Sequence, residues 1–180
     1  IYEDEYSRGI PTKELVDGLL PVVGKTRETG TETCFIPDDT IFEKTRFKED
    51  WLKSRLHETA YLNPNLHLFF RDERGDEPVE IEYYEPNGIV SFVEELVKDS
   101  EKAVTPVIYF KGKSEKTELE CAFQFTDSFE ENILGFCNGI YTVEGGTHIV
   151  GFKTKFLQLV NGYARQLGVL KEKDQNFLRN

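Results

Sequence analysis

The residues of this sequence that are best placed to do chemistry lie together in the segment EGGTHIVGFKT, residues 144–154. Gly145 and Gly146 tolerate a positive φ or the close approach of another group. Thr147, which precedes His148, is of a type that caps helix N-termini. Apolar residues at helical spacing follow at once. The segment predicts a tight turn that opens into a helix, and the free N–H groups at that helix start offer an alternative role in binding an anion.

Lys153 lies within the apolar face of the helix that we expect over residues 147–167. At about 100° per residue, the apolar side chains centre on one direction, and Lys153 falls inside their arc. These side chains are Ile149, Phe152, Phe156, Val160, Tyr163 and Leu167. An unpaired buried ammonium is costly, so Lys153 must reach solvent, pair with a carboxylate or line a wet cavity. The residues alone leave these alternatives open.

The sequence contains none of the motifs that mark nucleotide-binding loops or common hydrolases. GxxxxGK[ST], GxGxxG, GxSxG and HExxH are all missing from it. His57, His67 and His148 are isolated and lack the spacing of metal ligands. Carboxylates such as Glu130 and Glu131 are typical of a solvated turn. We therefore expect no catalytic residue and no metal site in this chain, and we expect the histidines to be ordinary polar residues.

The charge balance restricts contact with nucleic acid. Lys and Arg number 22 against 33 Asp and Glu, which gives a net charge of −11 and a pI near 4.8. Such a surface repels nucleic acid over most of its area, so any contact with DNA must be local.

Cysteine usage and hydropathy indicate a cytoplasmic protein. Cys34, Cys121 and Cys137 are widely separated, which favours small buried hydrophobes over a metal or redox pair. No run is long and apolar enough to cross a bilayer, and the N-terminus does not read as a secretion signal. We expect no membrane association. Because the chain has no methionine, we expect it to be part of a longer protein.

Hydrophobic periodicity predicts an α+β fold. Pro86, Asn87 and Gly88 form the clearest boundary, directly before a strong amphipathic stripe. The expected strands cover residues 1–6, 31–36, 66–70, 79–83, 106–111, 117–125 and 132–137. The expected helices cover 47–61, 89–97 and 147–167, with a helical turn at 13–20 and Gly168 as the residue that follows the last helix.

Several long strings resemble the family of the B subunit of bacterial DNA gyrase and its topoisomerase IV counterpart. The similarity runs in order along almost the whole chain. The strings that carry it are TGTETCFIPDDTIF, RLHETAYLNPNLHLFFRDERGDE, VIYF, ELECAFQFTDSFEENILGFCNGIYTVEGGTHIVGFKT and NGYARQLGVLKEKDQN.

The resemblance implies a division of the chain close to the boundary read from the residues. Residues 1–86 are expected to be the C-terminal part of a GHKL-type ATPase domain, a layered sandwich. Residues 87–180 are expected to be the N-terminal part of a transducer domain with a left-handed βαβ crossover, an exception to the usual right-handed rule.

The resemblance also implies function. In the family, ATP with Mg²⁺ dimerises two ATPase subunits around DNA, and a gyrase A-type subunit cleaves the DNA. Most of the ATP site is expected outside this chain, with Thr31 as one wall of the adenine pocket. Lys153 is expected to face the cavity for transported DNA. The chain is then expected to relay ATP binding and hydrolysis to the DNA gate and to be inactive alone.

The chain departs from the family pattern at several turns. It has YEPNGI where the family has YEGGI, and NGIYT where the family has NNINT. Asparagine tolerates the left-handed conformation better than most residues, so the same turns remain accessible. These departures leave open the choice between gyrase and topoisomerase IV. They also leave open an alternative function, a non-catalytic interaction or regulatory module of the same ancestry.

Overall fold

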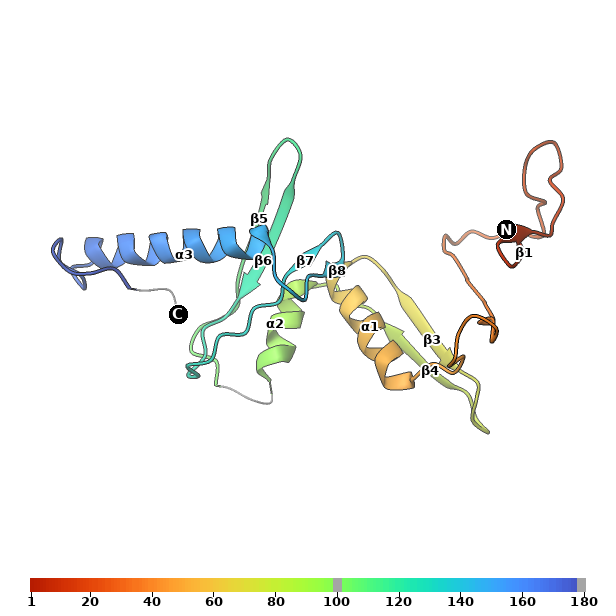
Figure 1. Ribbon diagram of the computed structural model, residues 1–180, viewed down its shortest axis with the longest axis horizontal. Helices are drawn as coiled ribbons and strands as arrows, with labels where there is room; N and C mark the ends of the chain where they lie inside the picture. The colour runs from red at the N-terminus through yellow and green to blue at the C-terminus, as the bar shows by residue number, and fades with distance from the viewer. Residues whose placement is uncertain (99–101, 178–180) are drawn as a thin grey trace. The chain divides into compact units, whose positions relative to one another are not determined.

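The computed structural model describes residues 1–98 and 102–177, which belong to two compact units, Ile1–Arg46 and Phe47–Asn180. Three helices and short strands make up the fold (Figure 1). The helices are α1 (Glu49–Leu62), α2 (Ile89–Val97) and α3 (Thr147–Gln166). The strands are β1 (Tyr6–Ser7), β2 (Ile10–Pro11), β3 (Leu68–Asp72), β4 (Val79–Tyr83), β5 (Ile108–Lys113), β6 (Glu118–Phe123), β7 (Phe136–Cys137) and β8 (Ile140–Tyr141).

The first unit consists mainly of tight turns. Strands β1 and β2 form a short antiparallel hairpin through Arg8 and Gly9, both at positive φ. A second turn places Asp17 and Gly18 at positive φ between the bridged residues on either side of them. None of residues 1–46 is fully buried.

Three expectations for the first unit were wrong. Residues 1–6 do not form a continuous strand, because the Arg8–Gly9 turn confines pairing to β1 and β2. The turn at 13–20 is not helical, since positive φ at Asp17 and Gly18 is incompatible with a right-handed helix and typical of a two-residue hairpin turn. Residues 31–36 form no strand, since no described segment pairs with their backbone groups.

In the second unit, α1 packs along the antiparallel hairpin of β3 and β4 (Figure 1). Acidic residues in the first turn of α1 complement the positive end of the helix dipole. The register pairs Phe70 with Ile81, so apolar residues from both strands share one face of the hairpin. This helix and this hairpin confirm the expectations for residues 47–61, 66–70 and 79–83.

Helix α2 follows Gly88, whose φ of 57° turns the chain directly before the helix. Its apolar stripe packs against α1 and against β6 of the next hairpin. Strands β5 and β6 pair from Ile108 with Phe123 to Lys113 with Glu118. The amphipathic helix and both strands expected here are therefore present, with β5 shifted by two residues and β6 shorter than expected.

The last part of the chain forms one small hairpin and the longest helix. Only Phe136–Cys137 of the expected strand at 132–137 pairs, with β8 across a turn at Asn138 and Gly139. Helix α3 ends at Gln166, and in the turn after it the Val169 N–H donates to the Ala164 carbonyl and the Gly168 N–H to that of Arg165. Gly168 has a φ of 71°, which confirms the predicted left-handed residue after the helix.

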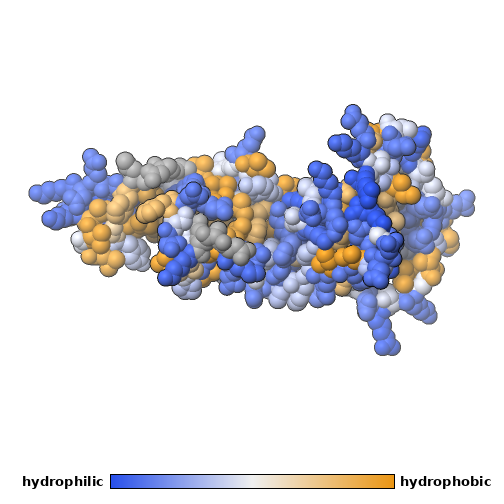
Figure 2. All heavy atoms as spheres, turned by 90° about the horizontal axis from the view of Figure 1, so that it is seen from below, coloured by the Kyte–Doolittle hydropathy of each residue, from blue (hydrophilic) through white to orange (hydrophobic). Residues whose placement is uncertain are grey.

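The buried core is small, and the fold is α+β as expected. Ala60, Tyr61 and Ala164 are the buried hydrophobic residues of the described chain. On the face shown in Figure 2, hydrophobic residues reach the surface in patches between hydrophilic ones. All strand pairs among the described residues are antiparallel hairpins. No described helix combines the length and apolarity needed to cross a membrane.

Candidate functional site

Helices α1 and α2 meet at a stack of aromatic rings centred on Tyr61. The Tyr61 side chain stacks on His57 of the same helix, with ring centroids 4.4 Å apart. On its other face it stacks on Phe92 of α2 at 4.8 Å, with the two planes inclined by only 7°. Tyr61 is 5% exposed, the lowest value of any aromatic residue in the described chain. We call this α1–α2 contact the junction.

The junction also holds the segment that connects β4 to α2. His57 Nε2 lies 2.8 Å from the Glu85 carboxylate, and its ring packs against Tyr83 at 5.3 Å. His57 thus ties α1 to the residues immediately before Pro86. Together with the Tyr61–Phe92 stack, these contacts connect residues on the two sides of the expected domain boundary, which itself stays a prediction.

A second histidine holds the same segment at a more exposed position. His67 Nδ1 lies 2.7 Å from Glu82, and its ring stacks on Tyr84 at 3.9 Å. Both histidines were expected to be ordinary polar residues, so their contacts with this segment were missed. The spacing of His57 and Tyr61 on one helix face was the available signal, but the pairing with Glu85 spans 28 residues and leaves no local pattern.

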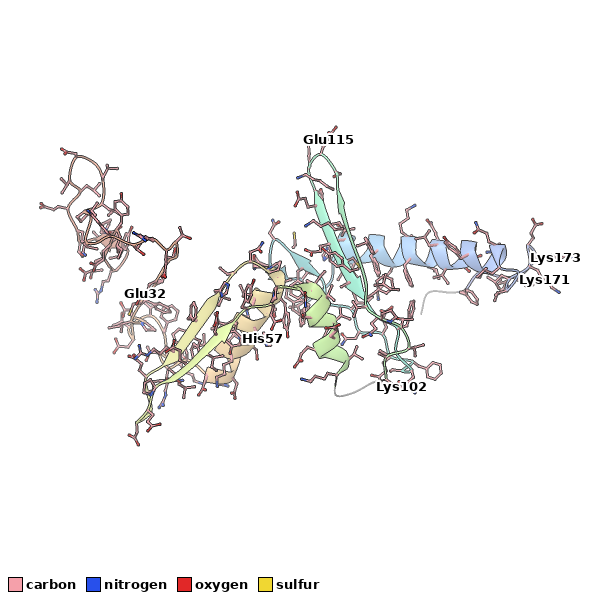
Figure 3. The ribbon with its side chains drawn as sticks, turned by 180° about the vertical axis from the view of Figure 1, so that it is seen from behind. Glu32, His57, Lys102, Glu115, Lys171 and Lys173 are labelled. Carbon is pink, nitrogen blue, oxygen red and sulfur yellow. The ribbon has the colours of Figure 1, made fainter. Side chains whose placement is uncertain are left out.

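An open cleft of about 630 Å³ lies beside the junction. Its walls come from α1, α2, the end of β4 and the chain after β6, and His57 on its α1 side is labelled in Figure 3. The lining includes the carboxylates of Glu85, Glu94 and Glu95. Burial, with the charges of Glu85 and Glu95, raises the pKa of Tyr61 to about 12. The phenol therefore stays protonated at neutral pH.

The described residues do not by themselves fit ATP with Mg²⁺. No three of their His, Cys, Asp or Glu side chains are grouped closely enough to hold a metal ion. Thr31 is exposed in the first unit, and its hydroxyl forms no hydrogen bond within the described chain. Thr31 is thus one isolated polar group, and its expected role in an adenine pocket stays a prediction.

The turn before α3 has a different geometry from the one expected. The positive φ of 80° belongs to Gly145, whose N–H donates to the Thr142 carbonyl, whereas Gly146 is extended. The helix begins at Thr147, and Gly146 is its N-cap. The prediction of Thr147 as the N-cap residue was therefore wrong, and no side chain forms a capping hydrogen bond at this helix start.

His148 and a second glycine fix the start of α3 against β7 and β8. His148 Nε2 lies 3.2 Å from Thr142 Oγ1, which donates to the Gly135 carbonyl at 2.9 Å. A Cβ on Gly135 would lie 2.5 Å from the Ile149 side chain. Gly135 is therefore needed where the first turn of α3 packs, and the sequence analysis missed it.

Lys153 forms an ion pair with Glu131. The lysine side chain is 22% exposed and the glutamate side chain 58%, so the ion pair is partly exposed to solvent. The apolar face around Lys153 is occupied by Phe152 and Phe156, which contact Phe123 of β6. Of the alternatives considered for this lysine, the structure shows the carboxylate partner.

Curated relatives match nearly the whole chain. The B subunit of DNA topoisomerase 4 from Enterococcus faecalis is 44% identical over 160 residues, which are 88% of this chain and 23% of the relative. The B subunit of DNA gyrase from Clostridium acetobutylicum is 40% identical over 177 residues, 98% of this chain and 27% of the relative. The chain thus spans about a quarter of these relatives.

Solved structures show the same fold. The 43K ATPase domain of Thermus thermophilus gyrase B, solved in complex with an aminocoumarin, superimposes with a TM-score of 0.74 at 30% identity. That match covers 96% of this chain and 46% of the solved one. The B subunit of DNA gyrase from Myxococcus xanthus gives 0.71 at 24% identity, covering 92% of this chain and 46% of the other, and supports the fold alone.

The model of the DNA gyrase B family matches residues 88–180. The match begins at the glycine before α2 and runs through both hairpins, the glycine turn and α3. It covers more than half of the chain, and the relatives above extend the similarity through most of the remaining residues. The chain belongs to the DNA gyrase B family.

Proposed function

We propose that this chain is a segment of the ATPase subunit of an ATP-dependent type IIA DNA topoisomerase. Its junction transmits the changes that accompany ATP binding and hydrolysis to the DNA gate during strand passage. The gyrase B and topoisomerase 4 B relatives support this class of enzyme. The transmitting role fits a segment in which no three possible metal ligands are grouped among the described residues.

The observation that carries the proposal is the stack of Tyr61 on Phe92. It joins α1, which precedes the expected domain boundary, to α2, which follows it. Nearly parallel rings at 4.8 Å resist sliding and tilting of one helix against the other. A movement of α1 is therefore passed to α2 and, through the packing of α2 on β6, to the second hairpin.

The remaining partners of the proposal come from the family. ATP and Mg²⁺ bind mainly to other parts of the subunit, with Thr31 at the edge of the adenine pocket. The subunit pairs with a second copy, with a gyrase A-type cleavage subunit and with DNA, in the cytoplasm. ATPase domains among the solved relatives and the B-subunit names of the curated ones support these assignments.

The test uses Phe92→Ala in the full-length subunit, assembled with its cleavage subunit. We expect the number of ATP molecules hydrolysed per strand-passage event to rise on the order of threefold to tenfold, because the lost stack weakens the link between α1 and α2. Phe129→Ala is the matched control, since Phe129 is fully exposed. ATP hydrolysis and changes in plasmid topology are measured in the same reaction.

Two results would contradict the proposal. An unchanged ratio for a folded Phe92→Ala protein means that the junction does not transmit. If the unmodified protein gives no ATP-dependent strand passage with any cleavage subunit, the non-catalytic interaction module becomes the better description of the chain.

Lys153 supplies a second test, which concerns DNA. In this part of the proposal, DNA phosphate competes with Glu131 for the Lys153 ammonium, so the two substitutions act in opposite directions. Lys153→Gln should raise the DNA concentration that half-stimulates ATP hydrolysis, and Glu131→Gln should lower it, each about threefold. Both effects should shrink as salt increases.

The control for this DNA test is Lys155→Gln. Lys155 lies on the same helix but is exposed and bonded to Gln158 at 3.1 Å. Equal responses of Lys153→Gln and Lys155→Gln would assign Lys153 to structure alone.

A further inference from the structure

The cleft beside the junction carries negative charge from three carboxylates on two segments of the chain. Glu85 follows β4, while Glu94 and Glu95 lie on α2. The positive group in its lining is Lys98, whose amine is 3.6 Å from Glu95 with both side chains more than half exposed. A pair so exposed is weak, so a better-placed cation can displace it.

The hydroxyl of a largely enclosed side chain, Tyr61, reaches the same cleft. Tyr61 is 5% exposed and lines the cleft, yet its Oη forms no hydrogen bond with any described residue. The Oη atom itself stays accessible from the cleft, so it can accept a hydrogen bond there. An occupant that donates a hydrogen bond would satisfy it.

Another acceptor comes from the chain after β6. Gln124 donates from its side-chain N–H to the Thr105 carbonyl at 2.7 Å, which orients the amide and leaves its Oε1 to accept. One oxygen of Glu85 contacts His57, so its other oxygen is available as well. The cleft therefore offers acceptors from α1, α2 and the segments that follow β4 and β6.

The distances between these acceptors indicate which kind of cation the cleft can bind. A divalent metal needs several ligands within a few ångströms of one point, and no three His, Cys, Asp or Glu side chains of the described chain are grouped that closely. A cleft of about 630 Å³ instead has room for an extended molecule. An alkyl ammonium donates three hydrogen bonds and accepts none, which matches a lining of acceptors.

The geometry points to a binding site for a small organic amine, one that places an ammonium group among Tyr61, Glu85 and Glu95. The amine lies against both helices of the junction. This site stands on the cleft itself and does not rest on the proposed topoisomerase function. Its test contains neither ATP nor DNA, so the two proposals fail independently.

The test is a calorimetric titration of the protein with putrescine, a diamine, at neutral pH and about 0.15 M salt, where diffuse attraction is screened beyond roughly 8 Å. We expect saturable binding at one site. The neutral analogue 1,4-butanediol should give no binding. Glu95→Gln should weaken putrescine binding about tenfold, because a charged hydrogen-bond partner is lost.

Further variants distinguish binding of the diamine at this site from nonspecific electrostatic attraction of the diamine to an acidic protein. Lys98→Gln should tighten binding about threefold, since it removes the competing ammonium. Tyr61→Phe keeps the aromatic stack and should weaken binding about threefold through loss of the phenol. Glu115→Gln is the matched control, because Glu115 lies at the tip of the β5–β6 hairpin, away from the cleft (Figure 3).

Several outcomes overturn the site. These are no saturable heat with putrescine, equal binding of 1,4-butanediol, or the same loss of affinity for Glu115→Gln as for Glu95→Gln. Circular dichroism of each variant checks folding. Glu94→Gln replaces Glu95→Gln if the latter does not fold, with the same expected direction.

Discussion

The junction of α1 with α2 and the turn before α3 both connect elements of the second unit. Side chains hold the first connection, whereas backbone conformation and close packing hold the second. At the junction, Tyr61 is enclosed by His57 and Phe92, so side chains determine how the helices meet. Before α3, the determining features are the positive φ of Gly145 and the space left by Gly135. One connection depends on large side chains, and the other depends on their absence.

This difference predicts opposite responses to substitution. Removing a ring should damage the junction and hardly affect the turn. Adding a methyl group should damage the turn, since it depends on a left-handed backbone conformation and on a close contact.

The largest expected effect is that of Tyr61→Ala at the junction. Truncating a buried aromatic residue leaves a cavity and should lower the free energy of unfolding by about 3 kcal/mol. The matched control is Tyr163→Ala on α3, which removes an exposed ring and should change stability by about 0.5 kcal/mol or less. Urea unfolding followed by circular dichroism measures both. Equal losses for the two variants would remove the distinction between the regions.

A smaller effect is expected at the turn. Gly145→Ala forces a Cβ into the left-handed region and should cost about 1–2 kcal/mol. Gly146→Ala should cost less, because the extended backbone accepts any residue and the new Cβ meets only the ring of the exposed His148. Thermal unfolding compares the two variants. A larger loss for Gly146→Ala would mean that the contact with His148, and not the backbone, controls this turn.

The smallest expected signal is the titration of a single phenol. Because the pKa of folded Tyr61 is raised to about 12 from the ordinary value of 10.0, the folded state keeps this proton while the unfolded state loses it. The corresponding stability is fully present below pH 10 and is lost as pH rises from about 10 through 12. Tyr61→Phe should remove the part of the tyrosinate absorbance that appears at the highest pH. Loss of absorbance near pH 10 instead would show that Tyr61 is not enclosed.

The elements that the sequence predicted correctly have a repeating local pattern. The stripe of α2 and the alternation in β3 and β4 depend on neighbours a few residues away, so periodicity is enough to find them. Residues 31–36 alternate equally well but form no strand, since a strand needs a partner that local sequence does not specify. The Asp17–Gly18 turn had a sequence signal that was overlooked.

The candidate site was predicted less well than the fold. The glycine turn was found from its residues, but the conformations of Gly145 and Gly146 were not distinguished, because both glycines are compatible with either. The ion pair of Lys153 with Glu131 was one of several alternatives. The contact of His57 with Glu85 depends on folding of the chain between them and was not visible in the sequence.

The length of α3 means that a small rotation at its start causes a large movement at its far end. Its 20 residues make a rod about 30 Å long, and the contacts of Phe152 and Phe156 with β6 lie in its N-terminal half. Further along, Leu159, Tyr163 and Leu167 are exposed. A rotation of about 10° at the glycine turn would therefore displace the far end by about 5 Å, given this length. The N-terminal end of α3 is the centre of such a rotation, and its C-terminal end moves the farthest. A rotation too small to disturb the packing at the start of the helix therefore becomes a large displacement at its end.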